Sequence, residues 1–176
     1  MILKEPVRYR DDVEIRRDDE DETIEALSAT FGEILETTSR NYSHAVRAVH
    51  AKAHAVLSGR MVIEAGLPAE LSQGLFASPG EHRVVMRIST NAGDLLPDTI
   101  GLPRGLAIKV MDVAGERLPG AEGATQDFVL VNAPAFSAQR ADQFLGNLKL
   151  LAKTTDRATG AKVVLSKVLQ SVEGAL

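Results

Sequence analysis

Residues 47–59 read R-A-V-H-A-K-A-H-A-V-L-S-G, and the rest of the chain can be interpreted outward from this stretch. It places His50 among small apolar residues, three residues after Arg47. From Val46 onward the side chains alternate between two sides, which is the two-residue period of a strand. The pattern therefore predicts a strand that carries His50 and continues to about Ile63, with room beside the imidazole for a large flat group.

Length and composition describe an ordinary globular protein. The chain has 176 residues, of which 44% are hydrophobic and 25% charged, so we expect one domain with a substantial core. The net charge of −4 has both signs mixed along the chain, which gives no reason to expect nucleic acid as a partner. The absence of cysteine excludes disulfides, thiolate zinc sites, iron–sulfur clusters and a cysteine nucleophile. No apolar run approaches membrane-spanning length and no export signal is present, so we expect no membrane association and a cytoplasmic location.

The order of predicted elements indicates an α+β fold. Residues 1–22 are dense in charge and predict an exposed N-terminal arm, followed by one domain over 23–176. Apolar residues on one helical face predict a first helix from Asp21 to about Thr38. After the His50 strand, the pattern predicts a loop with a short helix over 65–76, Pro68 lying near its first turn, and then strands over 82–90, 104–112 and 127–132.

The last third of the sequence is predicted to be helical. One helix follows Ser137 as a plausible N-cap and is interrupted at Thr154, and a second covers 164–172. Strands that precede helices, rather than alternating with them, are typical of α+β proteins. The second helix is still in phase at Val172, and an amphipathic helix needs something to cover its apolar face, so we expect the chain to be truncated.

His50 is the leading candidate for chemistry, because an imidazole can act as a general acid and base near neutral pH. A purely structural histidine is the alternative. On a strand, His50 and His54 would lie roughly 13 Å apart, too far to share one metal ion. In helical geometry they would be adjacent, which leaves a metal-dependent hydrolase as a further alternative, although no metal ligand set is predicted. The hydroxyls of Ser89 and Thr90 could orient a neighbouring group.

Two arginines are predicted to need anionic partners. Arg47 and Arg87 are each embedded in an apolar, strand-like stretch, where an unpaired guanidinium would be very costly. The partner could be the carboxylate of Asp94 or Asp98, or it could be a ligand carboxylate or phosphate. No P-loop, dinucleotide fingerprint or G-x-S-x-G motif is present to suggest a different chemistry.

Four blocks, in the same order, together resemble the haem catalases. R-A-V-H-A-K (47–52) resembles the segment that carries the distal histidine, and R-I-S-T (87–90) resembles the R-F-S-T strand. D-T-I-G-L-P-R-G-L-A-I-K-V (98–110) resembles the D-T-x-R-D-P-R-G-F-A-V-K-F block. D-F-V-L-V-N-A-P-A-F (127–136) resembles the strand and loop that carry a haem-stacking phenylalanine. The blocks span about half of the chain, and their variants suggest the small, divergent branch of catalase-related peroxidases.

The resemblance implies a fold, a cofactor and a set of residue roles. The fold would be part of an antiparallel β-barrel with flanking helices, and the cofactor would be ferric haem b. His50 would be the distal acid–base residue and Ser89 its hydrogen-bonding partner. By the same resemblance, Arg47 and Arg87 would pair with the haem propionates, Val49 would line the peroxide channel and Phe136 would stack on the haem.

Two departures from the family pattern narrow the expected function. The distal asparagine of catalases would fall near Ala124 or Thr125, which favours a slower peroxidase or organic-hydroperoxide activity over fast dismutation. The family's proximal tyrosinate lies in a downstream R-x-x-x-Y helix, whereas Tyr9 and Tyr42 both precede His50 and lie outside such a motif.

The resemblance and its departures predict the distal half of a haem-dependent enzyme that decomposes hydrogen peroxide or an organic hydroperoxide. We expect a complete protein to be a homo-oligomer, and the isolated chain to self-associate because an unclosed barrel exposes strand edges. The alternative is a truncated, non-catalytic relative that binds haem or another apolar ligand.

Overall fold

The structure, a computed structural model, describes residues 17–44, 46–115 and 122–156. The helices in this part of the chain are α1 (Glu20–Tyr42) and α2 (Ala141–Thr154), with a 3₁₀ turn, η1 (Gly74–Phe76). The strands are β1 (Ala53–Ile63), β2 (Gly80–Thr90), β3 (Arg104–Val110) and β4 (Gln126–Val131). The predicted α+β class is confirmed. Most of the predicted N-terminal arm and the whole predicted helix over 164–172 lie outside the described residues.

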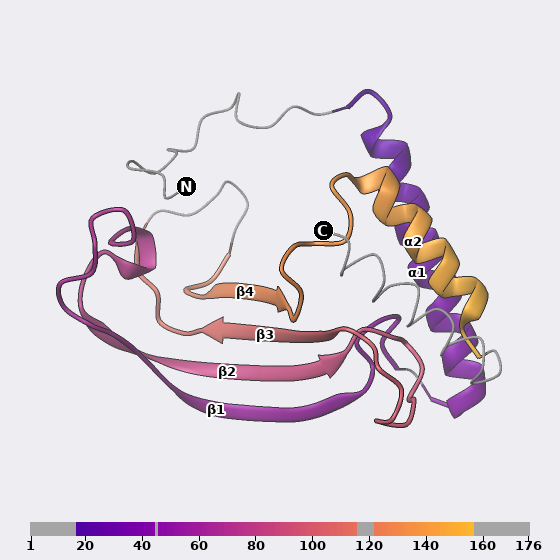
Figure 1. The fold of residues 1–176 in the computed structure, drawn as a ribbon, viewed down its shortest axis with the longest axis horizontal. Helices are drawn as coiled ribbons and strands as arrows, with labels where there is room; N and C mark the ends of the chain where they lie inside the picture. The colour runs from indigo at the N-terminus through magenta and orange to yellow at the C-terminus, as the bar shows by residue number, and fades with distance from the viewer. Residues whose placement is uncertain (1–16, 45, 116–121, 157–176) are drawn as a thin grey trace. The chain divides into compact units, whose positions relative to one another are not determined.

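The four strands form one antiparallel sheet in chain order, β1-β2-β3-β4 (Figure 1). The N–H of Asn91 donates to the carbonyl of Pro103, and the N–H of Met111 donates to the carbonyl of Arg83. This register places residue 89 of β2 opposite residue 105 of β3, and residue 90 opposite residue 104. The described strands form an open sheet that is not closed into a barrel. Of the predicted architecture, the sheet and helices are therefore present, and the barrel is not seen in this part of the chain.

The described residues divide into two compact units. The first comprises described residues within 56–87 and 107–129, and its core is formed by Val84, Val110 and Val113. Phe76 packs against Phe128 in this unit, with ring centroids 6.2 Å apart. The second unit comprises described residues within 17–55, 88–106 and 130–156, and one of its cores is formed by Ala92, Ile100 and Leu102.

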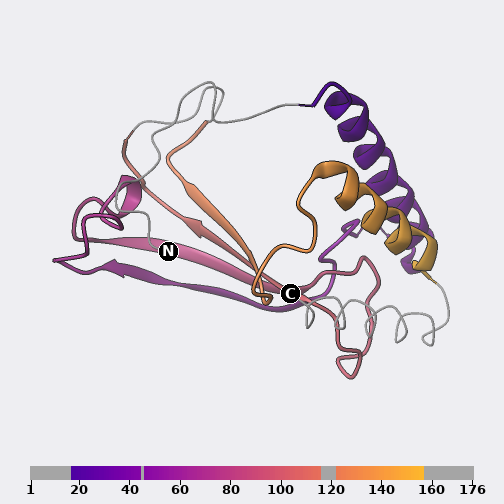
Figure 2. The same cartoon turned by 45° about the horizontal axis from the view of Figure 1, so that its top comes forward.

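The two helices of the second unit lie side by side in both views of the ribbon (Figures 1 and 2). Phe31 of α1 and Phe144 of α2 meet with ring centroids 6.5 Å apart. Ile34 of α1 and Leu148 of α2 are buried. In the described part of the chain, neither helix combines the length and apolar character that crossing a bilayer would require.

Helix boundaries differ from the predicted ones for local reasons. The predicted end of the first helix at Thr38 is wrong, because its hydroxyl donates to the carbonyl of Ile34 and the side chain is buried inside the continuing helix. The helix ends at Tyr42, and Ser43 follows in a left-handed conformation with φ 59°. The predicted N-cap at Ser137 is also wrong, because Arg140 occupies that position and α2 begins at Ala141.

The predicted short helix over 65–76 is reduced to η1, with a separate turn after Pro68. The turn forms because the N–H groups of Leu71 and Ser72 both donate to the carbonyl of Pro68. The strand predicted over 82–90 begins two residues earlier, at Gly80. The other strand predictions, over 104–112 and 127–132, agree with β3 and β4 to within two residues at each end.

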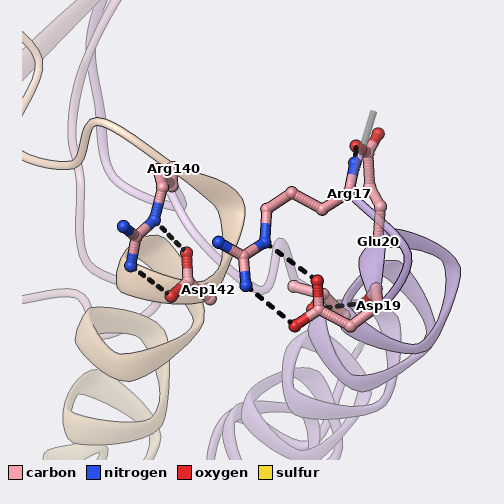
Figure 3. A network of polar contacts seen from close by, with 6 residues as sticks. Arg17, Asp19, Glu20, Arg140 and Asp142 are labelled. Atoms are coloured by element: carbon pink, nitrogen blue, oxygen red, sulfur yellow. Dashed lines mark hydrogen bonds and ion pairs between the residues drawn. The ribbon is translucent and has the colours of Figure 1, made fainter. Parts of the chain in front are cut away.

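Two arginine–aspartate pairs lie beside each other where α1 and α2 begin (Figure 3). Arg17 donates from Nε to Asp19 Oδ1 at 2.9 Å and from Nη2 to Oδ2 at 3.3 Å. Arg140 makes the equivalent contacts to Asp142 at 2.9 and 2.8 Å. The hydrogen bond from Arg140 is the main reason that the pKa of Asp142 falls from 3.8 to about 2. Asp142 also occupies the first turn of α2, where a negative charge interacts favourably with the helix dipole.

The lowered pKa of Asp142 predicts a pH-dependent contribution to stability. The folded chain binds this proton less readily than the unfolded chain, so the contribution is present above about pH 4. It is lost as the pH falls toward 2. We expect Asp142→Asn to lower the melting temperature at pH 6, by a small amount because the pair is exposed to solvent.

Thermal unfolding followed by circular dichroism between pH 6 and pH 2 measures this effect. The difference between wild type and Asp142→Asn should narrow through the acidic range. Asp18→Asn removes the same charge from an exposed site and is the control. A difference that stays constant with pH would contradict the assignment.

Candidate functional site

The segment that carries His50 is irregular. β1 begins at Ala53, so the predicted strand from Val46 is wrong for its first seven residues. His50 has φ 53°, which lies in the left-handed region. Residues other than glycine rarely adopt this backbone conformation. Such conformations persist where surrounding contacts enforce them, and they are frequent at functional sites. The alternation of side chains could not reveal this, because it reports side-chain type and not φ.

Backbone contacts from the segment after β2 hold His50 in this conformation. The N–H of His50 donates to the carbonyl of Asn91 at 3.0 Å, and the N–H of Ala51 donates to the carbonyl of Ala92 at 3.2 Å. Gly93 packs so closely beneath the segment that a Cβ there would overlap the carbonyl oxygen of Ala48. Residues 91–93 therefore fix the path of the chain on both sides of His50.

The imidazole of His50 lies between a hydroxyl and a glycine. Its Nδ1 is 3.0 Å from Oγ of Ser89, whose side chain is on β2 and is only 4% exposed. A Cβ on Gly105, directly opposite Ser89 on β3, would lie 2.6 Å from Cε1 and 2.9 Å from Nδ1 of the ring. The ring therefore occupies the space that a side chain at 105 would fill. In the tautomer that carries its proton on Nδ1, this nitrogen donates to Ser89 and Nε2 carries the lone pair that can accept a proton.

Gly105 was not among the predicted site residues, although the sequence holds a signal for it. A glycine inside an otherwise alternating strand often marks the close approach of another group. Large apolar side chains alternate with other residues over 106–110, and Gly105 is the position in this strand without a side chain. Sequence alone could not show that the approaching group is the ring of His50.

The other predicted haem-pocket residues have different surroundings. Arg47 is exposed and lies outside any strand, so the prediction that it is embedded in an apolar strand is wrong. Val49 is half-buried beside His50 in the sequence. Arg87 lies on β2 as predicted, is half-buried, and belongs to the first unit. Phe136 is 62% exposed and packs against Phe144, with ring centroids 5.8 Å apart.

A second polar cluster, formed by Lys52, His54, Thr90, Asp98 and Arg104, lies at the ends of three strands in the second unit. Thr90 Oγ1 is 2.7 Å from His54 Nε2 and accepts a hydrogen bond from Arg104 Nη1 at 2.8 Å. Lys52 Nζ lies 2.7 Å from Asp98 Oδ1, and His54 Nδ1 lies 3.7 Å from the same oxygen.

The hydrogen bond from Lys52 is the main cause that lowers the pKa of Asp98 below its ordinary value. The prediction that Asp98 might pair with Arg47 or Arg87 is therefore replaced by its pairing with Lys52.

The two histidines have different partners, His50 with Ser89 and His54 with Thr90 and Asp98. In the part of the chain that the structure describes, no group of three or more histidine, aspartate or glutamate side chains is arranged to hold a metal ion. The metal-dependent hydrolase stays a prediction, which the different partners of His50 and His54 do not favour. The positions suggested for a distal asparagine, Ala124 and Thr125, belong to the first unit, where Ala124 is exposed and Thr125 half-buried.

Comparison with known proteins leaves the family open. No family model, curated protein or solved structure matches this chain. The resemblance to the haem catalases therefore remains a prediction, which the geometry of the site has to support without relatives.

Two of the residues expected on one side of a haem are in contact in the structure. His50 and Ser89 supply an imidazole in a defined orientation, and the missing side chain at Gly105 leaves room for the ring. For the axial ligand, Tyr42 is the tyrosine within the described residues, and its hydroxyl accepts a hydrogen bond from the N–H of Leu95 at 2.9 Å. Tyr9 lies outside the described residues. The pair expected on the acid–base side, His50 and Ser89, is thus in contact, whereas Tyr42 bonds to the backbone of Leu95.

Proposed function

We propose that this chain forms the acid–base side of a haem-dependent protein that decomposes peroxides, a catalase-like peroxidase. The contact between His50 and Ser89 over Gly105 carries the proposal. Three of the four sequence blocks that resemble the haem catalases contribute one member each to this arrangement. The four-stranded sheet would then be a portion of the barrel of that family, and the setting would be the cytoplasm.

The proposed role of His50 follows from its position and requires the tautomer with the proton on Nδ1. A bound ferric haem would supply the redox chemistry, as cofactors do in such proteins. Nε2 of His50 accepts a proton from one oxygen of hydrogen peroxide or an organic hydroperoxide and delivers it to the other oxygen, which leaves as water or an alcohol. Ser89 keeps the ring oriented by holding Nδ1. The proposed role of Ser89 is therefore positioning, whereas His50 itself moves the proton.

The remaining residues of the proposal would bind the cofactor. The exposed guanidinium of Arg47 is available to a propionate three residues from His50, and Arg87 is proposed for the second propionate. Val49 would line the approach of the peroxide. The ring of Phe136, which is 62% exposed, retains surface on which a flat group could stack.

One observation favours a second candidate, a non-catalytic protein that binds haem or another apolar ligand. Tyr42, the tyrosine within the described residues, holds the backbone N–H of Leu95 with its hydroxyl and lies outside the R-x-x-x-Y motif that carries the axial ligand in the haem catalases. A chain that holds the acid–base side without an anionic axial ligand would bind the group without rapid turnover.

Haem titration and peroxide consumption, measured on the same samples, test both candidates. We expect a Soret band to develop when ferric haem is added to the chain. We expect His50→Ala to reduce peroxide consumption about 100-fold or more and Ser89→Ala to reduce it about tenfold. His44→Ala removes an exposed histidine and should have no effect. A Soret band without consumption by wild type would favour the non-catalytic protein, and the absence of any Soret band would overturn the haem proposal.

A further inference from the structure

The second polar cluster carries more positive than negative charge. Lys52 and Arg104 are permanent cations, whereas Asp98 is the one carboxylate within ion-pair distance of the cluster among the described residues. The next acidic residue of the same loop, Asp94, is buried and accepts a hydrogen bond from the N–H of Asp156. The two permanent cations therefore outnumber the one carboxylate by one charge.

Arg104 is the cation whose charge is not matched. Its Nη1 donates to Thr90 Oγ1 at 2.8 Å and more distantly to the carbonyl of Leu102 at 3.4 Å, and both partners are neutral. The side chain is half-buried, and no described carboxylate lies within ion-pair distance of it. A guanidinium presents five N–H donors in a planar arrangement that suits carboxylate and phosphate groups. Most of these donors are therefore available to an anion.

Strand register brings the cationic residues to one face of the sheet. The N–H of Thr90 donates to the carbonyl of Lys52, and Thr90 lies opposite Arg104 in the pairing of β2 with β3. Side chains directly opposite on neighbouring antiparallel strands lie close together on the same face. His54 lies two residues after Lys52, so it shares that side. Lys52, Thr90 and Arg104 thus form a cross-strand row, with His54 next to it.

Asp98 already occupies part of this row as an exposed anion. Its side chain is 68% exposed, whereas those of Lys52 and His54 are 27% and 23% exposed. The pKa of Asp98 is lowered first by the hydrogen bond from Lys52 and further by His54 and Arg104. The same three side chains therefore act on one carboxylate that could move aside into solvent.

We propose that Lys52, His54 and Arg104 form a binding site for a small oxyanion, a carboxylate or phosphate group of a ligand, in which Asp98 competes with the bound anion. The site differs from that of His50, because Ser89 and Thr90 are consecutive on β2 and point to opposite faces of the sheet. It does not depend on haem or on peroxide chemistry. The ligand chemistry is that of an oxyanion, and the experiment distinguishes its two sources.

Titration of the whole chain with sodium phosphate and, separately, with sodium acetate at constant ionic strength tests the proposal. The ring resonances of His54 report the binding, with those of His82 as an internal reference. We expect saturable shifts of His54 with one of the two anions at millimolar concentrations. Binding of phosphate alone identifies a phosphate group as the ligand chemistry, and binding of acetate alone identifies a carboxylate.

Two substitutions with opposite expected effects make the test specific. Arg104→Gln should weaken anion binding at least tenfold, and Arg104→Lys should restore part of it because the charge returns. Asp98→Asn should tighten binding about three- to tenfold, because it removes the competing carboxylate. Arg83→Gln and Asp112→Asn change the exposed pair Arg83–Asp112 in the same way and should alter binding less than about twofold.

The outcomes that overturn the proposal are equally specific. No saturable shift in wild type or in Asp98→Asn with either anion would exclude an oxyanion site. Weaker binding in Asp98→Asn would show that Asp98 supports the cluster structurally instead of competing with a ligand. An effect of Arg104→Gln no larger than that of Arg83→Gln would show that only the general charge of the surface is involved.

Discussion

Replacing Gly93 by alanine is expected to destabilise the chain by about 3 kcal/mol. The added Cβ would overlap the carbonyl oxygen of Ala48 and come within 2.9 Å of Cγ2 of Ile34. Ile34 is buried, and a carbonyl oxygen belongs to the backbone, so neither neighbour can yield cheaply. The substitution would push the segment before His50 away from residues 91–93.

Urea unfolding of Gly93→Ala and Gly32→Ala measures this expectation against a matched control. Gly32 lies inside α1, and a Cβ there would meet nothing within 4 Å. Alanine at that position should raise the free energy of unfolding by about 0.5–1 kcal/mol, because glycine is a poor helix former. Both substitutions add the same methyl group. Because only the one at Gly93 meets close neighbours, their effects on the free energy of unfolding should have opposite signs. If Gly93→Ala lowered the free energy of unfolding by less than about 0.5 kcal/mol, the close packing against Ala48 would not be required for stability.

The second large effect is expected at Gly105, where alanine should move the ring of His50. A Cβ there would lie 2.6 Å from Cε1 of the imidazole, so the ring has to rotate away and its hydrogen bond to Ser89 is lost. If the proposed peroxide chemistry holds, a displacement of this size should reduce peroxide consumption about 100-fold. The fold should lose only about 1–3 kcal/mol, because a side chain can move where a backbone cannot.

The position of the ring can be measured without haem. The Cε1–H resonance of His50 should change its shift and its titration midpoint in Gly105→Ala, whereas those of His44 and His82 should not. Gly80→Ala is the control, because Gly80 likewise lies on a strand, β2, and nothing approaches its position within 4 Å. An unchanged His50 resonance with full activity would contradict the role assigned to Gly105. If the His50 resonance changed in Gly105→Ala but the wild-type chain bound no haem, the contact between Gly105 and His50 would be confirmed and the proposed function would not.

Much of the fold was predictable because it rests on periodic patterns. Alternating side chains predict the strand over 104–112, and a helical period with acidic residues at its start predicts α1. The errors occur where one contact overrides the pattern. Thr38 extends its helix because its hydroxyl bonds within the helix instead of forming a turn. His50 leaves the extended conformation because its N–H reaches Asn91, which lies 41 positions further along the sequence.

The sequence pointed to one contact of the candidate site, and the arrangement around that contact could not be predicted. The resemblance to a family selected His50 and Ser89, and the structure places them 3.0 Å apart. The role of Gly105 depends on the pairing of β2 with β3, which no local pattern specifies. The cross-strand row was not predicted for the same reason. Lys52, Thr90 and Arg104 are distant in sequence and become neighbours only through strand register.

The adjacency of Ser89 and Thr90 has a consequence for how the sequence of this protein can vary. Each hydroxyl serves a different histidine on a different face of β2. The insertion or deletion of one residue within the strand would turn each following side chain to the opposite face of the sheet. Each hydroxyl would then point away from the histidine that it now contacts. Length changes should therefore be excluded from β2 and tolerated in the connection over 64–79, which keeps the parity of the strand intact. A one-residue insertion or deletion in β2 before Ser89 would therefore disturb both histidine contacts at once.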